Sequence, residues 1–364
     1  MESVGMTLFG GVYPARRVLV TGHTGFKGSW LATWLSRMGS EVTGLSLPAD
    51  TSPNHWDLLH LPVANLVGDI RDIAAVQSAI RQSRPEIVFH LAAQPLVLQS
   101  YRAPLETWST NVLGTANVLE ACRSAPDLRA IVIVTTDKVY ANIQTPRGYI
   151  EEDRLGGHDP YSASKAASEL VVESYRKSYF FEDDAPLIAT ARAGNVIGGG
   201  DWSEDRLIPD VMRALSRGCS LEVRSPNSTR SWQHVLECVA GYLLLGQKLF
   251  SGHRDLAEAW NFGPGPEDNC SVASVLARFQ KYWPQVQWHR SDVPKHHEAK
   301  LLCLDSRKAR ARLGWKPVWD LDTALLKTAD WYRQLAESER LLTHQQLKSY
   351  EASATQSGCV WAAQ

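Results

Sequence analysis

The sequence predicts an α/β fold in which a doubly wound parallel sheet carries helices on both faces. Short runs of β-branched residues alternate with helix-like segments from Arg17 to about Val196, as expected of βαβ units. Runs such as 18–20 and 131–134 are apolar at every position, which is typical of strands covered on both faces. A glycine-rich turn joins the first run to the first helix-like segment. These three observations favour a parallel over an antiparallel sheet.

Length and composition exclude several classes of protein. The chain has 364 residues, which at about 150 residues per domain suggests two domains. Its 38 basic and 39 acidic side chains leave a net charge of −1, so no global field attracts a nucleic acid. No apolar run is long enough to span a membrane, and the first basic residue is Arg16. We therefore expect no membrane contact and no signal peptide, and a cytoplasmic protein.

The cysteines predict neither a disulfide framework nor a metal site. Six are scattered along the chain without a Cys-x-x-Cys pair, which favours reduced thiols. The residues His296, His297 and Cys303 lie near one another in sequence, but a fourth ligand at suitable spacing is missing. We expect no metal.

The elements follow in a regular order. Strands are expected at 17–22, 41–47, 64–70, 86–93, 129–136 and 186–196. Beyond Val196 the sequence becomes richer in Gly, Trp and Asp, with helices expected at about 207–217, 234–249, 271–282 and 322–335. We expect a larger domain over 16–196, to which a segment around 231–262 returns. A smaller mixed α/β substrate domain over 197–335 is interleaved with it, and 336–364 form a C-terminal tail that is either a loosely attached helix or partly disordered.

The glycine-rich turn predicts a phosphate site. The strand Val18–Thr21 runs into Gly22-His-Thr-Gly25-Phe-Lys-Gly28, and a helix-like segment follows. Glycines at this junction permit a tight turn, a close backbone approach to a pyrophosphate and close helix packing. The helix N-terminus then presents free N–H groups to the anion. The pattern is that of a Rossmann-type domain, and it makes a dinucleotide the expected ligand of residues 16–196.

The segment after the second strand favours NAD over NADP. No Arg or Lys lies between residues 38 and 70, whereas a 2′-phosphate needs a cation. The usual acid at the end of this strand is absent, and Asp50 is its nearest substitute. At the end of the third strand, Asp69 is placed to reach the adenine amino group and Ile70 to pack on the ring; the alternative for Asp69 is a solvated turn.

A candidate catalytic pair opens a later helix. The segment from Asp159 to Lys165 reads as an N-cap, a proline in the first turn and a helix. Tyr161 and Lys165 are four residues apart and share a helix face. A tyrosine with a pKa near 10 is a weak base at neutral pH, but a neighbouring ammonium and a cationic nicotinamide both favour its phenolate. A hydroxyl proton and a carbinol hydride could then leave together.

These motifs, with Leu91-Ala-Ala, Asn111 and Thr135-Thr136, resemble the extended short-chain dehydrogenase/reductase superfamily over about residues 16–335. The resemblance implies that Tyr161 is the base, that Lys165 holds the nicotinamide ribose and that Thr136 hydrogen-bonds the sugar. The indicated cofactor-binding residues are Gly22, Thr24, Gly25, Phe26, Lys27, Gly28, Asp69, Ile70, Leu91, Ala92, Ala93, Asn111, Thr135, Tyr161 and Lys165.

Two ionisable residues follow Thr136 and narrow the expected chemistry. Asp137 and Lys138 stand at the carboxyl end of a central strand, where open α/β sheets bind ligands. Nucleotide-sugar 4,6-dehydratases use an acid and a base here to eliminate water after oxidation at C4. The common hexose dehydratases carry Asp-Glu, so Asp137 is the expected acid. Lys138 serves as base only if its pKa is lowered by burial and a nearby cation.

An Asp-Lys pair at this position resembles two groups, the CDP-glucose 4,6-dehydratases and the inverting UDP-N-acetylglucosamine 4,6-dehydratases. The segments 192–202, 207–210, 229–237 and 297–299, with 93–97, are similar to the CDP-glucose family. A diphosphate needs cations or amide donors, which Arg230 and Asn195 supply. The expected substrate-binding residues are Gln94, Thr136, Asn195, Arg206, Arg230 and Gln233.

Other functions stay open at this point. Another nucleotide-sugar 4,6-dehydratase or a 4-epimerase of the same fold fits the same motifs, and a non-catalytic dinucleotide sensor fits the phosphate loop alone. The resemblance also implies a role in bacterial surface polysaccharide synthesis. It further implies a homodimer or a dimer of dimers, paired through the helices at about 104–124 and 161–180.

Overall fold

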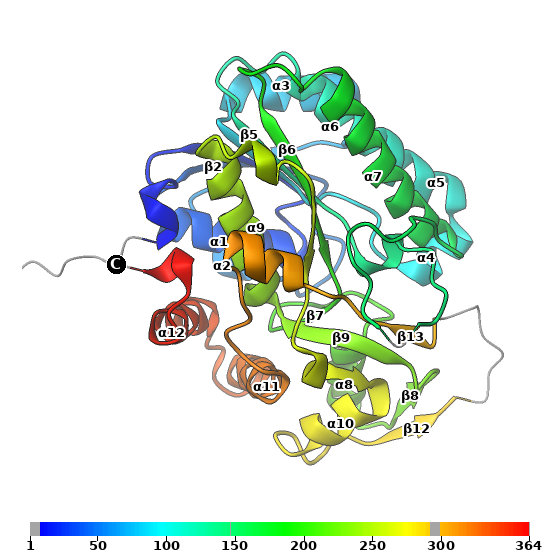
Figure 1. Ribbon diagram of the computed structural model, residues 1–364. Coiled ribbons are helices and arrows are strands. Elements are labelled where there is room, and N and C mark those ends of the chain that lie inside the picture. Colours follow the sequence, from blue (N-terminus) through cyan, green and yellow to red (C-terminus); the bar gives the residue numbers. More distant parts are fainter. Residues whose placement is uncertain (1–7, 146, 292–298, 364) are drawn as a thin grey trace, which may run out of the picture.

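The computed structural model describes residues 8–145, 147–291 and 299–363 (Figure 1). Its centre is a seven-stranded parallel sheet in the order β10–β6–β5–β4–β1–β2–β3, which confirms the predicted fold class. The strands are β1 Arg17–Thr21, β2 Glu41–Ser46, β3 Ala64–Val67, β4 Ile87–His90, β5 Ala130–Val134, β6 Leu187–Ala193 and β10 Ala259–Phe262.

Strand β5 shows why continuous apolar runs lie at the centre of the sheet. All five of its residues are buried. Ile131 and Ile133 pack into the hydrophobic cluster on one face, whereas Val132 packs into the cluster on the other. Since successive side chains point to opposite faces, a strand covered twice needs apolar residues at every position.

Two helical layers cover the sheet (Figure 1). The first contains α3 Ile73–Ser83, α6 Gly114–Cys122 and α7 Pro160–Ser178. The second contains α1 Phe26–Arg37 and α9 Val235–Phe250. Helix α9 is buried along almost its whole length, because it packs between the sheet and the C-terminal helices. The remaining α-helices before residue 300 are α2 His55–Leu59, α4 Val97–Arg102, α5 Pro104–Trp108, α8 Leu207–Ser216 and α10 Val272–Gln280.

The described residues also contain short helical turns. The 3₁₀ turns are Leu8–Gly11, Asp137–Val139, Arg254–Leu256, Pro266–Asp268 and Val360–Ala362, and the π-helical turns are Ser109–Leu113 and Ala309–Leu313. The π-helical turn at 109–113 joins α5 to α6, so that the expected helix at 104–124 is one continuous helical stretch of three parts.

A second, smaller group of strands lies beside the carboxyl edge of the main sheet. Strand β9 pairs with β11, β13 and β7, and β8 pairs with β12. Their bounds are β7 Asn195–Ile197, β8 Leu221–Val223, β9 Thr229–His234, β11 Asn269–Ser271, β12 Trp288–Arg290 and β13 Leu301–Leu302. Because β10 returns to the main sheet from this region, we propose the interleaved two-domain division indicated by the sequence.

The C-terminal segment is part of the core, so the expectation of a loosely attached tail is wrong. Helices α11 Leu321–Ser338 and α12 Thr343–Gln356 pack against the second layer (Figure 1). Trp361 is fully buried and stacks on Phe9 at 5.0 Å between ring centroids. The Tyr350 hydroxyl donates to the buried Glu237 carboxylate at 2.8 Å. These partners are distant in sequence, which hides them from a local pattern.

All six cysteines are free thiols. Within the described ranges, no helix has both the length and the apolar character needed to cross a membrane.

Replacing Trp361 with Ala should destabilise the whole chain. Removing a buried aromatic ring leaves a cavity between Phe9, Trp34 and Tyr350, and such a change costs about 3–5 kcal/mol. Urea unfolding measures this loss. The neighbouring side chain of Val360 is 55% exposed, so Val360→Ala should change the free energy of unfolding by less than about 0.5 kcal/mol. Equal unfolding midpoints for the two variants would contradict this assignment.

Candidate active site

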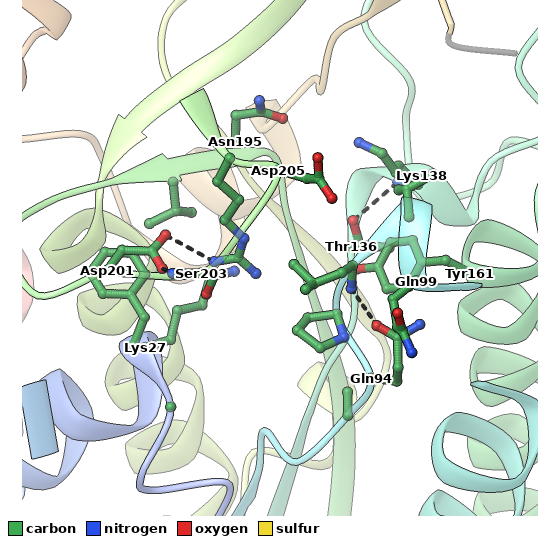
Figure 2. A pocket seen from close by; sticks show the side chains of 18 of the residues that line it. Lys27, Gln94, Gln99, Thr136, Lys138, Tyr161, Asn195, Asp201, Ser203 and Asp205 are labelled. Atoms are coloured by element: carbon green, nitrogen blue, oxygen red, sulfur yellow. Dashed lines mark hydrogen bonds and ion pairs between the residues drawn. The ribbon is translucent and has the colours of Figure 1, made fainter. Parts of the chain in front are cut away.

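A cavity of about 1150 Å³ opens at the carboxyl edge of the main sheet. The ends of β1, β4, β5 and β6 and the start of α7 line one side, and α8, β8 and β9 line the other. Figure 2 shows Lys27 and Asp201 facing Thr136, Lys138 and Tyr161 across this space. The cavity is large enough for two ligands side by side, and its walls divide into a glycine-rich part and a part rich in ionisable residues.

The glycine-rich turn has the geometry of a phosphate cradle. Gly22 adopts φ +76°, a left-handed conformation that favours glycine. A Cβ atom there would lie 2.6 Å from the backbone nitrogen of Ala92, and a Cβ atom on Gly28 would lie 2.1 Å from the Gly22 carbonyl oxygen. Helix α1 begins at Phe26, so its N-terminal N–H groups face the cavity. These features fit a bound pyrophosphate.

Most expected cofactor-binding residues line the cavity, and Asn111 is the exception. The lining set is Gly22, Thr24, Gly25, Phe26, Lys27, Gly28, Asp69, Ile70, Leu91, Ala92, Ala93, Thr135, Tyr161 and Lys165. Asn111 is buried behind the wall, where its amide donates to the Gln94 carbonyl oxygen at 3.1 Å and to Ser164 Oγ at 2.9 Å. Direct contact of Asn111 with a ligand in the cavity is therefore not what the structure shows. Its bonds instead join the β4 loop to α7.

The two acids considered for the cofactor also lie in the wall. Asp50 lines the cavity beyond the end of β2. The Asp69 carboxylate accepts from Arg71 Nη2 at 2.5 Å, and this partner lowers the pKa of Asp69. Asp69 is therefore ionised and already paired, and its contact with adenine stays a prediction.

Thr136, Asp137 and Lys138 leave β5 and enter the cavity in a 3₁₀ turn. The Thr136 hydroxyl donates to Asp137 Oδ1 at 3.0 Å and caps the turn. Asp137 is 1% exposed, and its Oδ2 atom has no hydrogen-bond partner among the described residues. A buried acceptor without a hydrogen-bond partner lowers the stability of the fold. Such an atom at a cavity wall indicates a group that binds a ligand.

Helix α7 brings Tyr161 and Lys165 to the same wall as Thr136. Asp159 caps the helix by accepting from the Ser162 backbone N–H at 2.9 Å, and Pro160 occupies the first turn. Both catalytic candidates are buried and line the cavity. The Lys165 ammonium donates to the Val134 carbonyl oxygen at 3.4 Å.

Burial dominates the ionisation of this pair. It raises the pKa of Tyr161 to about 12, although a hydrogen bond with Thr136 and the charge of Arg206 oppose the rise. Burial and the nearby Lys27 lower the pKa of Lys165 to about 8. Tyr161 alone is therefore a poor base at neutral pH, and a bound cation beside it is needed to favour the phenolate.

A cluster of cations and acids faces Tyr161. Arg206 donates to Asp201 at 3.1 Å, and although burial opposes its charge, this carboxylate raises the pKa of Arg206. Burial and Arg206 together lower the pKa of Lys27, against the attraction of Asp137 and Asp201. Figure 2 shows Asp201 and Ser203 on this wall. Together with Lys165, Lys27 and Arg206 place three cations around one cavity. This arrangement forms a site for an anionic ligand.

Five of the six expected substrate-binding residues lie in the cavity wall, namely Gln94, Thr136, Asn195, Arg206 and Arg230. Gln233 does not. Its side chain is buried and donates to the Phe262 carbonyl oxygen at 2.8 Å. Arg230 and Gln233 are three residues apart on β9, and side chains alternate along a strand, so only one of them faces the cavity.

Several lining residues were not assigned any role from sequence. Asp201 lies in the segment 192–202, but only the structure shows that it pairs with Arg206. Glu222 on β8, Arg224 directly after this strand and Gln99 on α4 also line the wall. They occupy ordinary polar positions in sequence, so no local signal marked them. No group of three His, Cys, Asp or Glu in the described residues is placed to hold a metal; His296 and His297 lie outside those residues.

The fold and the site define a dinucleotide-binding protein of the extended short-chain dehydrogenase/reductase superfamily. Within it, the sequence pattern of the GDP-mannose 4,6 dehydratase family matches residues 19–328, and the chain belongs to this family. A CDP-glucose 4,6-dehydratase of Salmonella typhimurium is 41% identical over 94% of this chain and 98% of its own length.

Solved structures agree with the fold. An epimerase of Methanothermobacter thermautotrophicus superposes with a TM-score of 0.81 at 24% identity, over 93% of this chain and 97% of its own; this likeness concerns the fold alone. A dTDP-glucose 4,6-dehydratase of Streptomyces venezuelae, solved with NAD bound, has a TM-score of 0.73 at 26% identity, over 87% of this chain and 97% of its own.

The buried charge of Lys165 should weaken the fold in a pH-dependent way. Its folded-state pKa of about 8 lies below the ordinary value of 10.5, so the unfolded chain binds this proton more tightly. Lys165→Met should therefore raise the free energy of unfolding below about pH 8, by up to roughly 3 kcal/mol. The gain should fade as the pH rises toward about 10.5. Urea unfolding at about pH 7 and about pH 10 tests this, and a variant less stable than the parent at pH 7 would contradict it.

Proposed function

We propose that this chain is a CDP-glucose 4,6-dehydratase, which converts CDP-D-glucose to CDP-4-keto-6-deoxy-D-glucose and water. The observation that carries the proposal is the Asp137–Lys138 pair beside Thr136, which lies next to Tyr161 on one wall of the cavity. A simple reductase or 4-epimerase has no use for such a pair. The 41% identity to the Salmonella typhimurium CDP-glucose 4,6-dehydratase, over nearly the full length of both chains, supports the same substrate.

The cofactor proposed for the glycine-rich part of the cavity is NAD, which supplies a hydride acceptor at C4 and returns the hydride to C6. The turn from Gly22 to Gly28 would hold its pyrophosphate, and Lys165 its nicotinamide ribose. Since no Arg or Lys lies between residues 38 and 70, that part of the site offers no cation for a 2′-phosphate. The neighbouring NAD-bound dehydratase structure supports this choice.

Oxidation at C4 requires removal of the hydroxyl proton. Tyr161 would take this proton from the sugar O4 atom, and the Thr136 hydroxyl would hydrogen-bond to the same sugar oxygen. Because burial raises the pKa of Tyr161 to about 12, positive charge from Lys165 and from the bound nicotinamide is needed to make it a competent base. The ketone formed at C4 then acidifies the proton on C5.

Elimination requires an acid at the C6 oxygen and a base at C5. Asp137 is the proposed acid, since its Oδ2 atom is buried and unpartnered in the described residues. Lys138, which is half-buried at the cavity wall, is the proposed base. A lysine base requires an ammonium that gives up its proton readily.

The diphosphate would lie between the two parts of the cavity. Arg206 and Arg230 are the proposed ligands, because a guanidinium binds phosphate oxygens in pairs. Asn195, at the start of β7, is placed on the same wall (Figure 2) and would donate its amide. Gln94 would contact the hexose from the β4 side.

We also propose that the chain pairs with a second copy through α5, α7 and the π-helical turn at 109–113. Large apolar side chains stand exposed there, namely Leu105, Trp108, Leu113 and Leu170. Exposed apolar residues gathered on adjacent helices are typical of an interface.

We propose the cytoplasm as the location of the protein, because its six free thiols favour a reducing compartment.

Two substitutions separate the proposed steps. The parent chain should convert CDP-glucose, whereas Tyr161→Phe should lose at least about 100-fold of the rate at the oxidation step and show no absorbance of reduced nicotinamide. Asp137→Asn should oxidise the sugar but eliminate water slowly, so that this absorbance builds up. The assays are absorbance near 340 nm and mass spectrometry of the sugar. An Asp137→Asn enzyme that fails at oxidation but eliminates normally would overturn the assignment.

A further inference from the structure

One buried ion pair lies directly behind the cavity wall. Arg192 on β6 contacts Glu169 on α7 through two hydrogen bonds of 2.9 Å, from Nε to Oε1 and from Nη2 to Oε2. Both side chains are about 4% exposed. Burial alone would raise the pKa of Glu169, but Arg192 and the hydroxyls of Thr135 and Thr190 lower it, so the carboxylate is ionised. A two-pronged buried pair of this kind has one favoured geometry.

This pair holds the segment Thr136–Lys138 at both ends. Immediately before the segment, Thr135 Oγ1 donates to Glu169 Oε1 at 2.5 Å. Shortly after it, Arg192 Nη1 donates to the Tyr140 hydroxyl at 2.9 Å, and that hydroxyl donates to Asn261 Oδ1 at 2.7 Å. Every one of these groups is buried. The backbone between residues 135 and 140 is thus fixed against the same two charges.

One member of the pair, Glu169, also stands on α7, the helix that carries Tyr161 and Lys165. Tyr161, Lys165 and Glu169 follow one another at four-residue spacing on α7, and residues so spaced share a helix face. Glu169 therefore stands one turn beyond Lys165, at the point where the helix meets β5 and β6. A shift of α7 along the sheet would have to break the ion pair.

We propose that Glu169 and Arg192 are positioning residues that fix Tyr161 and Lys165 relative to Thr136–Lys138. The inference rests on the proposed function, in which the two segments act on one sugar in succession. Neither charge touches the cavity, so neither is a catalytic residue. Their effect is transmitted through Thr135 and Tyr140 on one side and through the backbone of α7 on the other. Catalysis by orientation requires such support behind the reacting groups.

Tyr140→Phe is the sharpest test, because it cuts the link from Arg192 to the segment and leaves the ion pair in place. The ring stack of Tyr140 on Tyr149, at 5.1 Å between centroids, should also survive. We expect kcat with CDP-glucose to fall by about tenfold or more, with KM changed by less than about threefold. Amide hydrogen exchange over 135–141, followed by mass spectrometry without substrate, should be faster than in the parent. Glu169→Gln should give the same pattern, more strongly.

The matched control is Tyr350→Phe. Tyr350 is also fully buried, and its hydroxyl also has a buried hydrogen-bond partner, here the carboxyl group of Glu237, but it lies in α12, away from the cavity. It should keep kcat within about twofold of the parent. The proposal is overturned if Tyr140→Phe keeps kcat as Tyr350→Phe does, or if exchange over 135–141 stays at the parent rate. Failure of the parent chain to convert CDP-glucose would refute the proposed function instead, and the exchange measurement would then decide the positioning role alone.

Discussion

The parallel direction of the strands is the constraint on which the rest of the molecule depends. Because every strand of the main sheet runs the same way, all of their carboxyl ends meet at one edge. The phosphate cradle after β1, the segment Thr136–Lys138 after β5 and Asn195 after β6 are far apart in sequence, yet they line a single cavity. The helices that cross between strands bring Tyr161 and Lys165 to the same place.

The electrostatics of this edge favour a ligand over the empty protein. Lys165 is buried and Lys27 and Arg206 are half-buried around one cavity, and loss of solvent lowers the pKa of Lys27 and of Lys165. Such an arrangement weakens the fold. In the proposed complex, the negative charges of a diphosphate and a dinucleotide would offset this cost. The cavity therefore destabilises the folded chain, whereas the Arg192–Glu169 pair and the aromatic packing of the C-terminal helices stabilise the structure around it.

The features of the site that could be predicted are those formed by residues close together in sequence. The turn from Gly22 to Gly28 and the Tyr161–Lys165 pair are each complete within one short segment, so the sequence could point to them, and both line the cavity; their roles stay predictions. Gln233 was misplaced because strand alternation was not applied to β9, and Asn111 because its inward contacts with Gln94 and Ser164 lie in other segments. The packed tail, the Asp201–Arg206 pair and the Arg192 network were not predictable, since each joins residues that no sequence period relates.

The central claim is that this site removes water from one particular nucleotide sugar. The direct measurement incubates the purified chain and NAD separately with CDP-glucose, UDP-glucose, dTDP-glucose and UDP-N-acetylglucosamine, and follows each by mass spectrometry and proton NMR. We expect loss of one water from CDP-glucose alone, with a new 6-methyl signal and no net reduced nicotinamide. Water loss only from another sugar would contradict the substrate assignment, and binding of NAD without conversion of any sugar would contradict catalysis itself.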